Sequence, residues 1–362
     1  MSITVYLKIT NYCNVGCDFC YLPESARKDK SVMSNADAAT IALRAERLAE
    51  QYGYKSVHYI IHGGEPLTLS PSRLDDVLST ISAASTIQVS FSLQTSLVPY
   101  RNTYAPFVHK WMDGRVGTSI DFRGRTVSGS NLRYQKLWLQ KVEEARNDNI
   151  MLTPIHVPSR SDIGRESEIV RFFLENNFDD FSIERYNSYG DSLPSPSRPR
   201  NIEHSNILIG FATAIFDEFK KGRVIGNNVI LSALRGISEG LSGDRWGTNC
   251  IKNFMVVTPG GEVDYCPDRV EFSPELGRIN EPELIARQGR IKLLSEYQHG
   301  HSNSYCVSCE NYSWCRTGCP ITDNNVAKEG DCSGYRHFLT WLRSYDRHVR
   351  DEYRHTVAIS RV

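Results

Sequence analysis

The cysteines of this chain are confined to two short regions, and their spacing constrains the fold more than any other feature. Three stand close together, at Cys13, Cys17 and Cys20, and seven more lie between Cys250 and Cys332. The stretch from 21 to 249 contains none. Clustered cysteines in a reducing cytosol more often bind metal or act in redox chemistry than form disulfides. The spacing therefore predicts metal-binding loops at both ends of the chain.

Composition excludes several classes of protein. The 362 residues carry 42 Lys and Arg against 42 Asp and Glu, so the formal net charge is zero. A balanced charge argues against a general electrostatic grip on nucleic acid or on an anionic membrane. No apolar run approaches the roughly 18 residues of a spanning helix, and the N-terminus lacks a secretory signal. We expect a cytoplasmic protein with no nucleic-acid or membrane partner.

The first half of the chain alternates strand-like and helix-like segments. Such alternation predicts right-handed βαβ crossovers and a parallel sheet. Six units favour an α/β fold with a partial (β/α)6 barrel over a complete eight-unit barrel. Ser34 is a plausible N-cap, with Asp37 in the capping-box position. The expected strands are 3–9, 56–61, 86–93, 116–120, 151–157 and 180–184, and the expected helices are 34–51, 73–83, 104–112, 132–147 and 166–176.

The second half has a different organisation. Residues 187–203 are rich in Ser and Pro and predict a linker, followed by helices near 206–220 and 229–239. From about 244 to 335 the chain is rich in loops and cysteine, so bound metal could supply its stability. The expected domains are a barrel over 1–186, a linker with bridging helices over 187–243, an auxiliary domain over 244–335 and one C-terminal helix over 336–362.

Cys13, Cys17 and Cys20 form a Cys-x3-Cys-x2-Cys motif directly after the first expected strand. Three thiolates on one loop can bind three irons of a [4Fe–4S] cluster and leave the fourth iron open to a small molecule. The alternative is an incomplete zinc site, although structural zinc normally takes four ligands. The spacing favours the cluster.

A second motif, His62-Gly63-Gly64-Glu65-Pro66, ends the next expected strand. Paired glycines allow a ligand to approach the backbone closely, and proline stiffens the exit. Both motifs fall at the carboxyl edge of a parallel sheet, where the active sites of barrels assemble.

With these two motifs the chain resembles the radical S-adenosylmethionine (SAM) superfamily. The resemblance implies that Cys13, Cys17 and Cys20 hold a [4Fe–4S] cluster whose open iron binds SAM. Reduction then cleaves SAM to methionine and a 5′-deoxyadenosyl radical that abstracts hydrogen from substrate. The remaining cofactor-binding residues implied by the resemblance are Phe19 at the adenine, Gly63, Gly64 and Glu65 at the methionine amino group, Ser119 at the ribose and Arg125 near the carboxylate. Arg125 has an alternative interpretation, an ordinary solvated loop arginine.

The seven later cysteines match the SPASM extension found in one branch of that superfamily. The resemblance implies two auxiliary [4Fe–4S] clusters, hence three clusters in all. Zinc is the alternative for the Cys-x2-Cys pair, but seven cysteines suit four-coordinate zinc poorly. The implied ligands are Cys306, Cys309, Cys315 and Cys332 for the outer cluster, and Cys250, Cys266 and Cys319 for the inner one.

The ligand count departs from the family pattern. Three cubanes have twelve irons, and SAM occupies one, which leaves eleven for a chain with ten cysteines. One iron of the inner cluster would therefore lack a thiolate. Asp244 could supply an oxygen ligand, or that iron is open to water or substrate; the alternative for Asp244 is a turn residue.

The substrate is less constrained than the initiation chemistry. We predict oxidative modification of a ribosomally made peptide, with a carbon-centred crosslink, and a sugar or nucleoside as the alternative substrate. Sulfatase-maturing relatives carry aspartate directly after the cysteine equivalent to Cys266, whereas this chain has Pro267 and then Asp268, which weakens that interpretation. Asp268 is the candidate general base, against the alternative of an exposed carboxylate without a role.

The implied partners follow from this chemistry. An electron donor such as flavodoxin or ferredoxin would reduce the first cluster. The chain begins two residues before its first expected strand, so we expect no N-terminal leader-binding domain, and a peptide would bind the core. The loop over 121–131 and the segment 187–203 could line its groove. A different class of function, an iron–sulfur electron carrier without catalysis, would not need the Gly-Gly-Glu-Pro motif.

Overall fold

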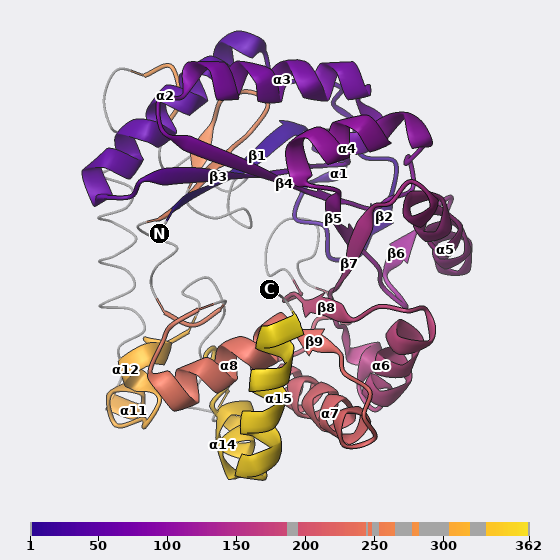
Figure 1. Cartoon of the computed structure of the whole chain (residues 1–362), viewed down its shortest axis with the longest axis vertical. Coiled ribbons are helices and arrows are strands. Elements are labelled where there is room, and N and C mark those ends of the chain that lie inside the picture. Colours follow the sequence, from indigo (N-terminus) through magenta and orange to yellow (C-terminus); the bar gives the residue numbers. More distant parts are fainter. Residues whose placement is uncertain are drawn as a thin grey trace. The chain divides into compact units, whose positions relative to one another are not determined.

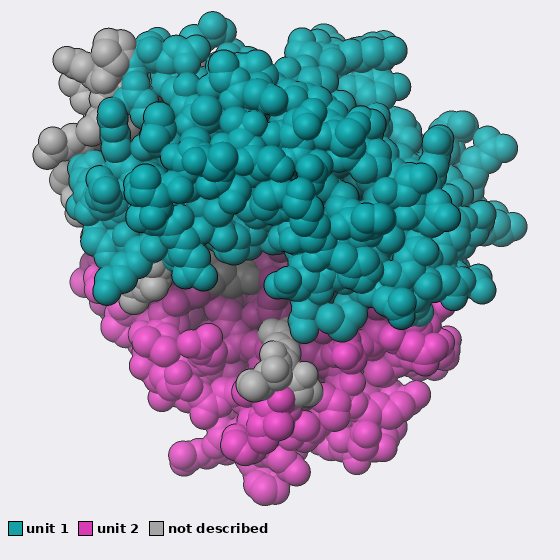
Figure 2. All heavy atoms as spheres, turned by 45° about the horizontal axis from the view of Figure 1, so that its top comes forward, with its two compact units in different colours: residues 1–153, 187–195, 250–294 teal, residues 154–186, 196–249, 295–362 magenta. Residues whose placement is uncertain are grey.

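The computed structural model describes residues 2–186, 195–243, 245–247, 253–264, 277–281, 304–318 and 331–360. By contacts the chain divides into two compact units. Unit 1 comprises residues 1–153, 187–195 and 250–294, and unit 2 comprises 154–186, 196–249 and 295–362 (Figure 2). Each unit is described by itself. No helix among the described residues is long and apolar enough to cross a membrane.

Unit 1 is built on a largely parallel sheet. Strands β1, β3, β4 and β5 pair in parallel in that order, as does β10 on the other side of β1, while β11 pairs antiparallel with β10 (Figure 1). The strands are β1 (Ile3–Thr10), β3 (Ser56–Gly63), β4 (Gln88–Thr95), β5 (Arg115–Ser119), β10 (Phe254–Val257) and β11 (Val263–Asp264). A separate two-stranded ribbon pairs β2 (Gly16–Cys17) with β6 (Arg125–Thr126).

Apolar side chains at every second position of β1 explain why this strand lies inside the sheet. Ile3, Val5, Leu7 and Ile9 are all fully buried, and they share one face because side chains alternate along a strand. Helices α2 and α4 pack against the strands of this sheet, and α3 packs against α2 and α4 (Figure 1). The helices of unit 1 are α1 (Glu24–Lys28), α2 (Asn35–Tyr52), α3 (Pro71–Ala84), α4 (Ala105–Met112) and α5 (Asn131–Asn147), with short 3-10 turns at Pro66–Thr68 and Asn102–Tyr104.

Unit 2 contains three short parallel strands covered by helices. Strand β8 (Asp180–Ile183) pairs with the end of β7 (Met151–His156) on one side and with β9 (Gly226–Asn227) on the other. The aromatic side chains of Phe173, Phe181 and Phe211 pack at the centre of this core. The helices are α6 (Glu166–Glu175), α7 (Asn201–Lys220), α8 (Asn228–Glu239), α11 (Ser304–Val307), α12 (Tyr312–Cys315), α14 (Arg336–Ser344) and α15 (Arg347–Ser360), with a 3-10 turn at Arg160–Asp162.

The predicted elements are present, with small shifts at their ends. Ser34 does cap α2: its side chain accepts a hydrogen bond from the Asp37 amide at 3.0 Å, and its hydroxyl donates to the Asp37 carboxylate at 2.7 Å. Helix α7 begins at Asn201, earlier than expected, because the Glu203 carboxylate accepts from the Arg200 amide. Local capping therefore decides where these helices start.

One expectation needs correction. The single C-terminal helix is two helices, because Tyr345 is extended and Asp346 accepts the free amides of His348 and Val349 at the start of α15. The loop-rich segment after 244 contains short strands, and one of them extends the central sheet. Strand β10 pairs with β1 from Thr4↔Phe254 to Leu7↔Val257. The expected linear domain boundaries remain a prediction.

Candidate active site

The three N-terminal cysteines lie on the loop that joins β1 to α1, and each is half-buried. The amide of Cys13 donates to the Arg27 carbonyl at 3.0 Å, and the amide of Cys20 donates to the Cys17 carbonyl at 3.2 Å. The thiols of Cys13 and Cys17 each interact electrostatically with the other cysteines of the loop. The loop therefore holds three sulfur donors at the carboxyl end of a parallel strand, the position where barrel active sites form.

The β2–β6 ribbon fixes the middle of this loop. Gly16 pairs with Thr126 and Cys17 with Arg125, and the Asp18 amide donates to the Gly124 carbonyl at 2.7 Å. The cysteine loop is thereby tied to the loop that follows β5. This tie joins the proposed cluster ligands to the residues expected to contact SAM.

Gly63 and Gly64 let the end of β3 approach the cysteine loop. A Cβ on Gly63, whose φ is +137°, would lie 2.1 Å from the Thr10 carbonyl oxygen, and one on Gly64 would lie 2.2 Å from that of Asn11. The amide of Gly64 donates to the Thr10 carbonyl at 2.8 Å. The glycine pair thus admits the chain's own backbone. A contact with the amino group of SAM stays a prediction for this turn.

Glu65 joins the ends of two strands. Its carboxylate, 1% exposed, accepts hydrogen bonds from the Leu67 amide and the Thr95 hydroxyl, and from both the amide and the hydroxyl of Ser96. Because these donors occupy the carboxylate, it fixes the end of β3 to the end of β4. A contact between this turn and SAM would accordingly come from backbone carbonyls.

Arg125 is a buried arginine in a defined setting. Its Nε donates to the Asp121 carboxylate at 2.7 Å, and Asp121 is fully buried. The guanidinium lies over the Phe19 ring, 5.3 Å from its centroid, and over Tyr134 at 5.7 Å. Burial raises the pKa of Cys17, and the positive charge of Arg125 acts in the opposite direction and lowers it. The interpretation as a solvated loop arginine is therefore wrong, because the side chain is only 8% exposed.

Helix α5 supports the end of β5. The Tyr134 hydroxyl donates to the Ser119 carbonyl at 2.5 Å, and the Trp138 indole donates to the Thr118 hydroxyl at 2.9 Å. The Asn131 amide bridges the carbonyls of Asp121 and Arg125. Ser119 itself is half-buried at the strand end. Arg125 thus lies against Phe19 and pairs with Cys17, while Tyr134 contacts both Arg125 and Ser119. A contact of Ser119 with SAM stays a prediction.

A polar group lies on the inner side of β1, β3 and β4. Lys8 is fully buried, and its ammonium lies 4.0 Å from the centroid of the Tyr21 ring. Tyr6 packs against His62 with ring centroids 4.6 Å apart, and its hydroxyl donates to Gln94 at 3.2 Å. Burial lowers the pKa of His62 to about 3, so this imidazole is neutral at physiological pH. Tyr6, Lys8 and His62 thus form a polar group within the sheet of unit 1.

Burial favours the protonated form of the Cys13 and Cys17 thiols, because it raises the pKa of both. Burial raises the pKa of Cys13 to about 12, with a further contribution from Glu65, and burial also raises that of Cys17. Iron binding must displace these protons, so loading is favoured by the charge of the metal. The donor set, three soft thiolates on one half-buried loop, fits the predicted cluster.

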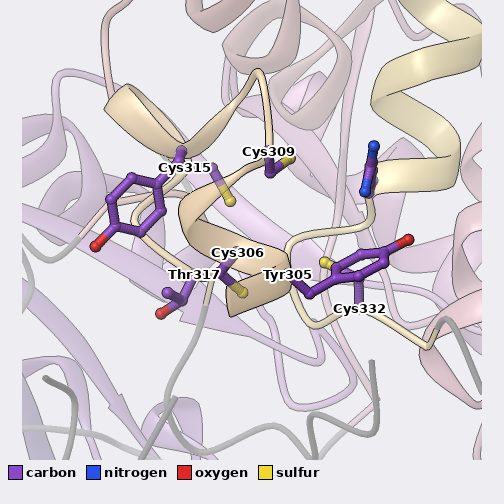
Figure 3. Close-up of a pocket in the computed structure, with 8 residues that line it drawn as sticks. Tyr305, Cys306, Cys309, Cys315, Thr317 and Cys332 are labelled. Atoms are coloured by element: carbon purple, nitrogen blue, oxygen red, sulfur yellow. The ribbon is translucent and has the colours of Figure 1, made fainter. Parts of the chain in front are cut away.

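A second set of thiols gathers in unit 2. Four cysteines line one cavity together with Tyr305, Tyr312, Thr317 and Arg336, and Figure 3 shows their sulfur atoms around it. These are Cys306, Cys309, Cys315 and Cys332, the four expected to hold the outer auxiliary cluster. Burial raises the pKa of Cys315 and of Cys332.

Packing around this cavity is tight. A Cβ on Gly334 would lie 2.5 Å from the Cys315 sulfur, and the Gly334 amide donates to the Cys332 sulfur at 3.3 Å. Trp246 donates to the Gly334 carbonyl at 2.9 Å and packs edge-on against Trp314. Amide donors and aromatic cover are features that tune an iron–sulfur cluster, so the residues fit such a group.

The other expected metal and catalytic positions cannot be placed. Cys250, Cys266 and Cys319 of the expected inner cluster, its candidate ligand Asp244, and the candidate base Asp268 lie outside the described residues. Within the described residues, no group of three or more His, Cys, Asp or Glu side chains could hold a single metal ion. A cubane places each thiolate on a separate iron, which is a wider arrangement than one tetrahedral ion requires.

Comparisons with known proteins cover nearly the whole chain. No protein-family model matches it. The serine-type anaerobic sulfatase-maturating enzyme of Klebsiella aerogenes is 21% identical over 357 residues, which span 92% of this chain and 84% of that enzyme. The enzyme of the same name from Klebsiella pneumoniae is 20% identical, over 92% of this chain and 87% of its own length.

Solved structures also match this chain over nearly its whole length. The structure of native anSMEcpe with bound AdoMet and Cp18Cys peptide superimposes with a TM-score of 0.78 at 15% identity, over 99% of this chain and 100% of that one. Streptococcus suis SuiB bound to precursor peptide SuiA gives a TM-score of 0.63 at 16% identity, over 95% of this chain and 76% of that one. The fold of the chain is the α/β radical SAM fold.

Three observations point to the same superfamily: the cysteine motif, the curated relatives that align over 92% of the chain, and the fold. In these three respects the chain resembles radical SAM enzymes. The recognition of this superfamily and of an enzyme is confirmed, as is the α/β fold with its cysteine-rich C-terminal region. The alternative of a non-catalytic iron–sulfur carrier is set aside.

Some residues of this radical SAM site were missed in the sequence. Asp121 stands four residues before Arg125, a spacing that could have suggested an ion pair, although the two residues are not on a helix. Lys8 lies mid-strand among apolar residues, and an inward-facing lysine carries no separate signal. Tyr134 sits on an apolar helix face, where its hydroxyl role is hidden.

Proposed function

We propose that this radical SAM enzyme oxidises a side chain within a peptide substrate, using a [4Fe–4S] cluster held by Cys13, Cys17 and Cys20. The observation that carries the proposal is the tie between the cysteine loop and the loop after β5, which pairs Cys17 with Arg125 and sets the Arg125 guanidinium over the Phe19 ring. When bound, the cluster and SAM supply a 5′-deoxyadenosyl radical for hydrogen abstraction.

The chain's own residues bind and orient the cofactor. Arg125, held by Asp121, offers a guanidinium to the carboxylate of SAM, and the Phe19 ring offers a face to the adenine. The backbone carbonyls of the Gly63-Gly64 turn offer acceptors to the amino group. Burial of Asp121 and Arg125 keeps water from this pair, which strengthens the interaction that fixes the guanidinium.

We extend the cofactor proposal to three clusters. Cys306, Cys309, Cys315 and Cys332 supply four thiolates to the outer auxiliary cluster, supported by the cavity that they line. Cys250, Cys266 and Cys319 supply three to the inner one. Its fourth iron takes Asp244 or remains open to substrate.

A peptide is the substrate class that the comparisons support. Both of the solved structures described above contain a bound peptide. We propose two outcomes for the oxidised side chain, a carbon-centred crosslink or a sulfatase-type oxidation, and the names of the curated relatives favour the second as strongly as our sequence interpretation favours the first. Asp268 is the proposed base that accepts the proton released after hydrogen abstraction.

The two outcomes differ in their products. A crosslink joins two side chains and removes two hydrogens without creating a carbonyl. Oxidation of a serine CH2OH also removes two hydrogens but leaves an aldehyde. The reconstituted enzyme should be incubated anaerobically with SAM, dithionite and two peptides, one from a sulfatase and one encoded beside this gene, and the products analysed by mass spectrometry with and without a hydrazide probe.

Each result has a defined meaning. Loss of two hydrogens with hydrazide reactivity supports sulfatase-type oxidation, and the same loss without reactivity supports a crosslink. Asp268→Asn should retain SAM cleavage but lose most product, typically by a factor of about 10² to 10⁴ for a general base. Turnover of a sugar or nucleoside with neither peptide altered would contradict the peptide proposal. We place the reaction in the cytoplasm, where thiols stay reduced.

A further inference from the structure

An open groove lies at the start of helix α5 in unit 1, outside the site described above. Its apolar lining comes from Val127, Leu132 and Leu137, and its basic lining from Arg133 and Lys136. Leu132 is 62% exposed, which is high for a leucine on a helix. We call this feature the α5 groove.

The groove carries positive charge that none of the described residues neutralises. Arg133 and Lys136 are exposed, and neither forms an ion pair with any residue that the structure describes. Arg123, exposed on the loop before β6, also lacks such a pair there. Lys141, further along α5, does pair with Glu144 at 2.6 Å. In a chain of zero net charge, the two unpaired cations that line the groove are a local excess of positive charge that attracts an anionic partner.

The α5 groove also lies close to the cysteine loop. Val127 directly follows β6, and β6 pairs with β2 through Cys17↔Arg125 and Gly16↔Thr126. Figure 1 shows α5 with this ribbon beside it. From strand spacing and rise, the backbone of Val127 is on the order of 10 Å from that of Cys17. A redox centre seated in the groove would be separated from the cluster ligands by one two-stranded ribbon.

We propose that the α5 groove docks an acidic electron-transfer protein of the flavodoxin or ferredoxin class. The proposal rests on the proposed function, because it supplies that reaction's electron. The reduced donor loses one electron, and that electron breaks the sulfur–carbon bond of SAM to give methionine and the 5′-deoxyadenosyl radical. A small apolar patch with two cations beside it suits a transient redox complex, since such complexes are small and are steered by charge.

Charge reversal provides the test. The double variant Arg133→Glu/Lys136→Glu reverses the charge of the groove from positive to negative. The double variant Lys55→Glu/Arg115→Glu is the matched control. Lys55 and Arg115 are exposed, form no ion pair with a described residue, and lie at the amino ends of β3 and β5, away from the cysteine loop. Both double variants change the net charge equally, so only position distinguishes them.

The readout is 5′-deoxyadenosine formation with two reductants. With reduced flavodoxin at low salt, we expect the groove variant to be slower than wild type by about tenfold or more, and the control variant to match wild type. Added salt should slow the wild-type reaction with flavodoxin and reduce the difference in rate between the wild type and the groove variant. With dithionite, a small reductant that needs no docking surface, all three proteins should react at the same rate.

Other results would overturn the proposal. Equal rates for both double variants with flavodoxin would remove the groove as the docking site. Slower peptide modification by the groove variant under dithionite would assign the groove to the substrate. Binding of oxidised flavodoxin to the reconstituted protein should be measured as well, because it does not depend on SAM cleavage. Failure of wild type to cleave SAM with dithionite would contradict the proposed function, whereas intact binding in the groove variant would contradict this inference alone.

Discussion

Gly64→Ala should displace the cysteine loop by sterics alone. The added Cβ would lie 2.2 Å from the Asn11 carbonyl oxygen and 2.4 Å from that of Tyr12, where real Cβ contacts essentially never fall below 3.0 Å. The shortfalls are about 0.8 Å (3.0 − 2.2) and 0.6 Å (3.0 − 2.4). Both obstacles are backbone, so no side-chain rotation relieves them. Overpacking of this kind costs about 1–3 kcal/mol and moves the backbone.

The consequence falls on Cys13, which follows Tyr12 directly. We expect Gly64→Ala to lose about four irons per chain, the content of one cluster, and to form no 5′-deoxyadenosine. The assay is anaerobic reconstitution followed by iron analysis and product quantification.

A second glycine separates steric overlap from backbone strain. Gly129 has a φ of +76° with nothing within 4 Å of an added Cβ, so Gly129→Ala tests strain without overlap. It should cost about 1–2 kcal/mol and keep its iron. Full iron content and SAM cleavage in Gly64→Ala would refute the reasoning that the close backbone approach positions the loop.

Three further predictions follow from individual contacts. Asp121→Ala leaves the Arg125 guanidinium buried without its carboxylate partner, so it should lower the free energy of unfolding by about 3–5 kcal/mol and weaken SAM binding. Thermal melting measures the first effect and SAM titration the second. An unchanged melting point would contradict the buried ion pair. Burial lowers the pKa of His62 to about 3, so the unfolded chain binds a proton that the folded chain does not as pH falls below about 6.5. Stability should therefore fall from about pH 6.5 towards pH 3, and His62→Gln should flatten this slope in urea titrations; an identical slope rejects the assignment. Gly334→Ala places a Cβ 2.5 Å from the Cys315 sulfur, so iron should be lost from the unit 2 site while the SAM-binding cluster remains detectable by electron paramagnetic resonance; unchanged total iron would contradict the tight packing seen there.

The sequence was most informative where one local rule decides the structure. The strand of β1 follows from alternating apolar residues, and the Ser34 cap follows from a side chain that can reach its own helix. The Cys-x3-Cys-x2-Cys spacing identified the superfamily because cluster ligation requires particular residues within a short segment. Such features need no knowledge of distant parts of the chain.

Features that depend on distant pairing were not predictable. Nothing in Phe254–Val257 indicates that it pairs with β1, since its partner lies about 250 residues earlier. The motif suggested a ligand contact at its glycines, but not that they also let the end of β3 approach the backbone of the cysteine loop. The break between α14 and α15 depends on one capping aspartate, Asp346, within a region that otherwise favours helix.

Cleavage of SAM by the N-terminal cluster is the central claim, and one measurement tests it most directly. The wild-type chain and a variant with Cys13, Cys17 and Cys20 replaced by alanine should be reconstituted anaerobically with iron and sulfide, then mixed with SAM and dithionite. We predict 5′-deoxyadenosine and methionine from the wild type, and neither from the variant, which should still retain iron at its C-terminal cysteines. Equal 5′-deoxyadenosine from both proteins, or none from a fully loaded wild type, would contradict the account.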